Sequence, residues 1–210
     1  MGVFLSLDGL DGTGKSTQAR LLVEWLRGQG YAVTACTDPG GTDIGAKLRE
    51  ILLTGREQKM SIRTEAMLFM ASRAELVDRI IRPALARGEI VVSDRFLLAN
   101  VVYQGHAGGL DPADLWSVGN VATGGLQPDL TLVFDMPTDL AAVRRGRAAD
   151  RMESRGNEFA VRVRAGFLVE ARRRPELHRI VDASGEVEAV QAETRRIAGE
   201  FLRGRGFPVL

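Results

Sequence analysis

A glycine-rich segment near the beginning of the sequence carries residue types that hold phosphate groups. Residues 9–16 are Gly-Leu-Asp-Gly-Thr-Gly-Lys-Ser, which fits the spacing G-x-x-x-x-G-K-[ST] and follows an apolar run. Glycines let the backbone curl until successive N–H groups point at phosphate oxygens, and a helix expected to begin at Lys15 adds partial positive charge. The pattern predicts an ATP or GTP site in which Lys15 reaches the β- and γ-phosphates and Ser16 ligates Mg²⁺. The residues assigned to this loop are Gly9, Leu10, Asp11, Gly12, Thr13, Gly14, Lys15, Ser16 and Thr17.

Charged residues also follow two later apolar runs. Asp94 and Arg95 come directly after residues 90–93, and residues 38–42 are Asp-Pro-Gly-Gly-Thr. An aspartate at the end of a buried strand can hold Mg²⁺ or its water, and an adjacent arginine can hold a phosphate. A structural ion pair at a strand end is the alternative. The phosphate loop expected on a neighbouring strand favours the functional interpretation.

Short runs typical of β-strands alternate with helical segments, and this order positions the charged residues. We expect strands at Val3–Leu7, Tyr31–Ala35, Ile90–Ser93, Leu130–Phe134 and Arg179–Val181. The third and fourth runs are apolar enough for burial on both faces, which is typical of parallel sheets. The sequence therefore predicts an α/β fold of the P-loop NTPase class, a doubly wound parallel five-stranded sheet with helices on both faces. Ligands of such sheets bind at the carboxyl ends of the strands.

Three helices are the clearest in the pattern. One begins at Lys15 and is closed by Gly28 and Gly30, and another covers about 187–202. The longest runs from about Thr64 to Leu85, and Pro83 should kink it near its end. Its expected apolar face consists of Met67, Met70, Ala74, Val77, Ile81 and Leu85.

Composition limits the classes of protein that fit. A chain of 210 residues with a formal net charge of +1 suits one domain, here residues 1–210, and offers no overall field for nucleic acid or an anionic membrane. Cys36 is the only cysteine, and no apolar run approaches the ~18 residues needed to span a bilayer, so we expect a soluble, cytoplasmic protein. The sequence has no Asn-Lys pair, which argues against a Ras-type GTPase, and its length favours a small-molecule kinase.

Six segments in this order resemble the thymidylate kinase family over nearly the whole chain. They lie at residues 7–12, 38–42, 68–85, 94–96, 103–105 and 150–153. The resemblance implies a nucleoside monophosphate kinase that converts ATP and dTMP to ADP and dTDP, for dTTP biosynthesis. It also implies Mg²⁺ as cofactor and a homodimer, and the apolar face of the long helix suits either a dimer contact or the core.

Residue roles follow from the same resemblance. Asp11 matches the family residue that binds the 3′-hydroxyl of dTMP, and Arg95 matches the clamp on the acceptor phosphate. Phe69 and Arg73, four residues apart on one helix side, match the pair that stacks on thymine and binds its exocyclic oxygen. The matches to base and sugar contacts are Asn100, Tyr103 and Gln104. A tyrosine packed against the sugar would exclude a 2′-hydroxyl, which makes the deoxy preference steric.

An arginine-rich segment is expected to form a lid, at about 144–156. Positions 10–13 of the phosphate loop contain no basic residue, so the cation that stabilises the transferring phosphoryl group must come from elsewhere. By resemblance to bacterial members of the family, the lid supplies it. Arg151 is the first choice, followed by Arg147 and Arg155, and the resemblance places Arg144 beside adenine. The predicted catalytic set is Lys15, Asp94, Arg95 and Arg151, with Ser16 and Asp94 as metal ligands.

Four positions depart from the family pattern. Asp38 replaces a glutamate, Thr37 stands where many relatives have arginine, and Phe96 and Ala99 stand where tyrosine and serine are common. These changes leave the kinase assignment standing. Two rivals remain open: a kinase for another pyrimidine or deoxynucleoside substrate, and a nucleotide-binding regulator without turnover. Intact Lys15, Ser16, Asp94 and Arg95 argue against the regulator.

Overall fold

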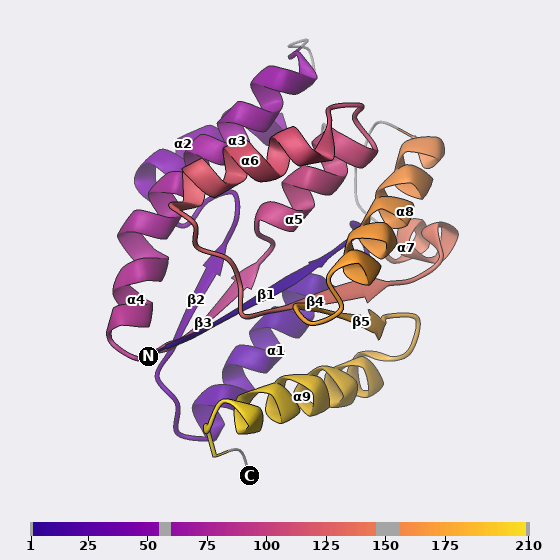
Figure 1. The fold of residues 1–210 in the computed structure, drawn as a ribbon. Coiled ribbons are helices and arrows are strands. Elements are labelled where there is room, and N and C mark those ends of the chain that lie inside the picture. Colours follow the sequence, from indigo (N-terminus) through magenta and orange to yellow (C-terminus); the bar gives the residue numbers. More distant parts are fainter. Residues whose placement is uncertain (1, 55–59, 146–155, 209–210) are drawn as a thin grey trace.

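The strands form one fully parallel sheet. A computed structural model describes residues 2–54, 60–145 and 156–208. Its sheet has the order β2-β3-β1-β4-β5, and every neighbouring pair is parallel (Figure 1). The strands are β1 (Val3–Gly9), β2 (Val33–Thr37), β3 (Ile90–Asp94), β4 (Leu130–Asp135) and β5 (His178–Asp182). This arrangement confirms the predicted doubly wound α/β fold.

The start of β2 differs from the prediction. Tyr31 is not a strand residue: its backbone N–H donates to Leu26 O at 3.2 Å, and its hydroxyl donates to the carbonyl of Pro208. Its ring also lies 5.7 Å from that of Phe207. These contacts tie Tyr31 to the turn after the first helix, so the strand begins two residues later, at Val33.

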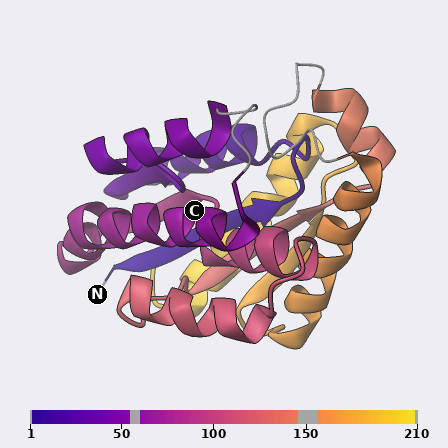
Figure 2. The same ribbon diagram turned by 90° about the horizontal axis from the view of Figure 1, so that it is seen from above.

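Helices cover both faces of the sheet. Helices α1 and α9 lie on one face, and most of the others lie on the opposite face (Figures 1 and 2). The α-helices are α1 (Lys15–Gly28), α2 (Asp43–Thr54), α3 (Ile62–Leu76), α4 (Arg82–Ala86), α5 (Leu97–Asn100), α6 (Pro112–Thr123), α7 (Thr138–Arg145), α8 (Asn157–Arg173) and α9 (Val187–Gly204), with π-helical turns η1 (Val77–Ile81) and η2 (Val101–His106). Over the described ranges, no helix has the length and apolarity that crossing a membrane requires.

The long helix predicted for residues 64–85 is divided into α3, η1 and α4. Pro83 has no N–H and its ring would clash with the carbonyl four residues earlier. The chain avoids this by widening the preceding turn, so that Arg82 N–H bonds to Val77 O, five residues back. The expected kink is thus a π-helical turn.

The predicted apolar face of this helix is only partly correct. Met70, Val77 and Ile81 are buried, but Met67 is 42% exposed. The buried side of α3 instead includes Glu65 and Arg73. These polar residues are buried because α3 borders a polar pocket as well as the apolar core.

The core anchors the segment that follows β3. Phe96 is 1% exposed, and its ring meets that of Phe4 edge to face, with centroids 4.9 Å apart. Burying such a side chain contributes about 2 to 3 kcal/mol. The loss of the tyrosine hydroxyl at this position is therefore compatible with its place in the core, and the anchored phenylalanine fixes the neighbouring Asp94 and Arg95.

Candidate active site

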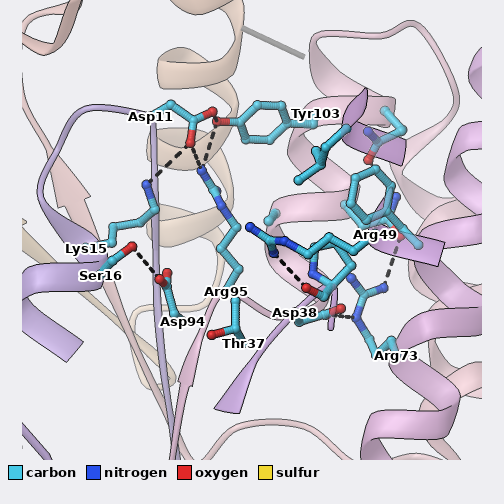
Figure 3. A pocket seen from close by; sticks show the side chains of 16 residues that line it. Asp11, Lys15, Ser16, Thr37, Asp38, Arg49, Arg73, Asp94, Arg95 and Tyr103 are labelled. Carbon is cyan, nitrogen blue, oxygen red and sulfur yellow. Dashed lines mark hydrogen bonds and ion pairs between the residues drawn. The ribbon is translucent and has the colours of Figure 1, made fainter. Parts of the chain in front are cut away.

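Many of the predicted functional residues line one cavity at the carboxyl ends of β1, β2 and β3. Its volume is about 150 Å³. Figure 3 shows Lys15, Ser16 and Asp94 on one side and Asp38 and Arg73 on the other, with Arg95 between them. The lining residues are Asp11, Lys15, Ser16, Thr37, Asp38, Pro39, Arg49, Leu53, Phe69, Arg73, Asp94, Arg95, Ala99, Asn100, Tyr103 and Gln104.

The phosphate loop forms between β1 and α1 because its glycines permit both its curvature and its packing. Gly9, Gly12 and Gly14 all have positive φ, at 144°, 93° and 85°. A Cβ at Gly12 would lie only 2.1 Å from the carbonyl oxygen of Ala141 in α7. Inside the loop, Lys15 Nζ donates to Leu10 O at 2.7 Å. Loop residue Thr17 is exposed and lies outside the cavity lining.

Lys15 is buried, and both positively and negatively charged side chains lie near its ammonium group. Burial, and then the charge of Arg95, lower the pKa of its ammonium group to about 8. The carboxylate of Asp11, 3.9 Å from Nζ, acts in the opposite direction. A phosphate in the loop would offset the desolvation of this lysine, because it supplies negative charge.

Two oxygen ligands lie side by side at the end of β3. Ser16 Oγ donates to Asp94 Oδ2 at 2.5 Å. A hydroxyl and a carboxylate are oxygen donors of the type that Mg²⁺ prefers, next to a loop built for phosphates. The donor set fits the metal predicted from the sequence.

Arg95 lies at the centre of the cavity. Among the described residues it is the sole non-glycine with positive φ, 72°, a conformation that costs about 1 to 3 kcal/mol. Its guanidinium donates to Gly9 O at 2.9 Å, to Asp11 and to Tyr103 Oη at 3.3 Å. Burial acts to raise the pKa of Asp11, but Arg95 and Lys15 hold it well below its usual range.

Asp38 and Arg73 form a buried ion pair on the other side. Arg73 Nε donates to Asp38 Oδ2 at 2.6 Å, and both side chains are at most 2% exposed. Burial raises the pKa of Asp38, and Arg73 opposes that shift. Asp38 is one methylene shorter than the glutamate of the family pattern, and it pairs with Arg73. Its second oxygen, Asp38 Oδ1, has no hydrogen-bond partner among the described residues.

Sequence reasoning missed Arg49 and Glu65. Arg49 of α2 lines the cavity and donates to Pro39 O at 2.7 Å. Glu65 of α3 is fully buried and accepts from Gln104 Nε2 at 2.8 Å. Neither belongs to a motif, and only the return of α2 and α3 toward the strand ends reveals them. The sequence did hold one signal for Glu65: it lies four residues before Phe69, and therefore on the same side of the helix.

The structure places Arg144 away from the cavity lining. Its guanidinium donates to Ala183 O at 2.6 Å, Ser184 O at 2.7 Å and Gly185 O at 2.9 Å. These bonds tie the end of α7 to the loop after β5. The expected lid arginines, Arg147, Arg151 and Arg155, lie outside the described residues.

The chain is similar to known proteins in both sequence and structure. A sequence profile of the family "Thymidylate kinase" matches residues 7–194. A thymidylate kinase of Rhodopirellula baltica is 50% identical over 193 residues, which cover 92% of this chain and 78% of the relative. One of Symbiobacterium thermophilum is 46% identical over 206 residues, covering 98% and 96%. The crystal structure of thymidylate kinase from Ehrlichia chaffeensis superposes with a TM-score of 0.76 at 28% identity, covering 94% of this chain and 98% of that one.

Proposed function

This chain belongs to the thymidylate kinase family and phosphorylates dTMP with ATP as donor, and from that premise we propose how its residues divide the work. One observation carries the assignment: the phosphate loop and the pocket under α3 open into the same cavity, with Arg95 between them. A donor phosphate and an acceptor phosphate held on the two sides would meet near Arg95. Transfer then depends mainly on positioning and charge neutralisation.

The donor side is assigned to the phosphate loop. Residues 9–17 bind the triphosphate through backbone N–H groups, and the ammonium group of Lys15 contacts the β- and γ-phosphates. Ser16 and Asp94 would hold Mg²⁺, whose charge, when it is bound, offsets the charge on the phosphate oxygens. Arg144, which donates to the loop after β5, keeps its assignment beside adenine from the family resemblance.

The acceptor phosphate is assigned to Arg95 and Arg49. Both guanidinium groups line the cavity, and a planar guanidinium can hold two phosphate oxygens in a fixed orientation. Arg49 would then supply the cation that is absent at Thr37. Asp11, which accepts from Tyr103 Oη at 2.7 Å, is placed to accept from the 3′-hydroxyl as well.

The base and sugar are assigned to the pocket between α3 and η2. Phe69 lines it as the stacking partner of thymine, while Arg73, Asn100 and Gln104 offer hydrogen bonds to the base edge. Tyr103 is 7% exposed and packs between Phe159 and Phe167, with centroids 6.2 and 6.1 Å away. A ring held so firmly leaves a ribose 2′-hydroxyl little room.

We also assign a lid to residues 144–156 of a single domain, with Arg151 as the arginine that stabilises the transferring phosphoryl group. A homodimer is proposed as well, because Ile44 and Ile51 of α2 and Met67 of α3 are 54%, 46% and 42% exposed. Light scattering after gel filtration should give twice the chain mass, and a monomer would contradict the dimer. Cysteine usage supports a cytoplasmic location.

The experiment that tests these roles is ADP release with Mg·ATP and a panel of acceptors: dTMP, dUMP, dCMP, UMP and thymidine. Turnover should be fastest with dTMP, and the steric role of Tyr103 predicts little turnover with UMP. Equal turnover with UMP and dUMP would remove Tyr103 from sugar selection. Turnover with thymidine would contradict the acceptor phosphate site.

A further inference from the structure

A continuous series of hydrogen bonds connects α3 with α5 and η2. Glu65 Oε1 accepts from Gln104 Nε2 at 2.8 Å, and Gln104 Oε1 accepts from Asn100 Nδ2 at 2.6 Å. Asn100 Oδ1 then accepts from Arg73 Nη1 at 3.0 Å, and Arg73 Nε donates to Asp38 at 2.6 Å. All five residues are at most 2% exposed. We call this series the polar ladder.

The polar ladder depends on the spacing of its residues along each helical segment. Glu65 and Arg73 are two helical turns apart on α3, whereas Asn100 and Gln104 are one turn apart across α5 and η2. The segments run in opposite directions here, because the earlier residue of the α3 pair, Glu65, meets the later residue of the other pair, Gln104. The wider π-helical turn that contains Gln104 is a feature often found at functional sites.

The ends of the polar ladder set its direction. A carboxylate such as Glu65 only accepts hydrogen bonds, and the guanidinium of Arg73 only donates them. Each amide between them must accept on one side and donate on the other. Gln104 therefore turns its N–H₂ group to Glu65, and Asn100 turns its carbonyl to Arg73. This orientation follows from the chemistry of the two ends.

We propose that Glu65 is a positioning residue for base selection, which keeps the carbonyl of Asn100 facing the Arg73 side of the pocket. The inference rests on the proposed base pocket. Glu65 acts through Gln104, because it does not itself line the cavity. In this orientation the pocket offers an acceptor, Asn100 Oδ1, beside a donor, Arg73.

The pattern fits one class of pyrimidine. Thymine and uracil carry an N3–H donor beside a 4-oxo acceptor, so both groups find partners. Cytosine reverses them, with an N3 acceptor and a 4-amino donor, and would leave two buried pairs mismatched. The polar ladder thus selects 4-oxo over 4-amino pyrimidines, and it has no means of distinguishing thymine from uracil.

The test compares kcat/KM for dTMP, dCMP and dUMP in wild type, Glu65→Met and Glu65→Gln. Methionine removes the acceptor that holds Gln104, so the preference for dTMP over dCMP should fall roughly tenfold. Glutamine can still accept from Gln104 but no longer excludes the reversed orientation, so the fall should be about two- to threefold. The preference for dTMP over dUMP should stay within twofold in both variants, because uracil presents the same edge.

Glu170→Met is the matched control. Glu170 is another buried glutamate, 1% exposed, and accepts from His106 of the same π-helical turn at 2.8 Å. Its removal loosens η2 without touching the polar ladder, so both preferences should remain as in wild type. Equal losses in Glu65→Met and Glu170→Met would assign Glu65 a merely structural role.

An unchanged dTMP-to-dCMP preference in folded Glu65→Met overturns the inference. If that variant does not fold, as judged by circular dichroism, an unchanged preference in Glu65→Gln does the same. Asn100→Ala separates this result from failure of the pocket assignment. Unchanged kcat/KM for dTMP in Asn100→Ala would refute the base pocket, whereas a loss there with no effect at Glu65 would refute only the role of Glu65.

Discussion

The phosphate loop and the base pocket face each other across Arg95, yet they are built differently. The loop is one contiguous segment, residues 9–16, which we propose holds its ligand mainly with backbone groups, and its lysine bonds to Leu10 O. The base pocket uses side chains from α3, α5, η2 and the end of β2, joined through the polar ladder. Changes to the Lys15 side chain of the loop should therefore affect chemistry with little effect on folding, whereas side-chain changes in the pocket should affect both.

The largest expected effect lies in the lid. Arg151→Ala should lower kcat by about 10³- to 10⁵-fold, because an arginine that meets the transferring phosphoryl group acts mainly in the transition state. KM for ATP should change little. Steady-state kinetics beside the exposed α8 variant Arg172→Ala provide the measurement. Wild-type turnover would transfer the role to Arg147 or Arg155.

Breaking the buried ion pair should have the next largest effect, and on stability. Arg73→Met leaves Asp38 charged and unpaired in the interior, which should lower the free energy of unfolding by about 3 to 5 kcal/mol. The double variant Asp38→Leu/Arg73→Met should recover much of that loss while remaining a poor kinase. Urea denaturation measures both, with the exposed Arg196→Ala as control. Equal stability of the single and double variants would contradict the account.

Lys15→Met should separate activity from stability. Turnover should fall about 10²- to 10³-fold, as for the loss of one donor to a transition-state oxyanion. The free energy of unfolding should stay the same or rise, since burial already disfavours the lysine charge. Thermal melting in parallel with kinetics would check this, and a strongly destabilised variant would show that the loop lysine supports the fold.

The smallest effect is a pH dependence. Since burial lowers the pKa of Lys15 to about 8, the protonated form is lost in the free enzyme above that pH. Accordingly kcat/KM for ATP should fall as pH rises beyond about 8, whereas kcat, measured with phosphates bound, should fall only at higher pH. Stability shows the opposite trend. The unfolded chain keeps this proton up to about pH 10.5, whereas the folded chain loses it near pH 8. The contribution of Lys15 to the free energy of unfolding should therefore rise as the pH increases from about 8 to 10.5. A kcat/KM that is flat to pH 10 would contradict the shift.

Much of the fold could be predicted from the sequence because its signals are local. Apolar runs located each strand, and the Gly-x-x-x-x-Gly-Lys-Ser spacing located the loop and the beginning of α1 at Lys15. The errors lie where distant contacts compete with local pattern. Tyr31 packs against Phe207 and lies outside β2, and Met67 is exposed while Glu65 and Arg73 lie on the buried side of α3.

The sequence by itself was enough to propose the chemistry of the donor side, since eight consecutive residues and a strand-end Asp-Arg pair carry that proposal. Only the tertiary structure decided which further side chains lie together on the proposed acceptor side. Glu65 meets Gln104 across 39 positions, and Asp38 meets Arg73 across 35. Backbone groups of a contiguous loop are placed by neighbouring φ and ψ angles, whereas a buried side-chain network exists only after the helices pack and each donor must find an acceptor.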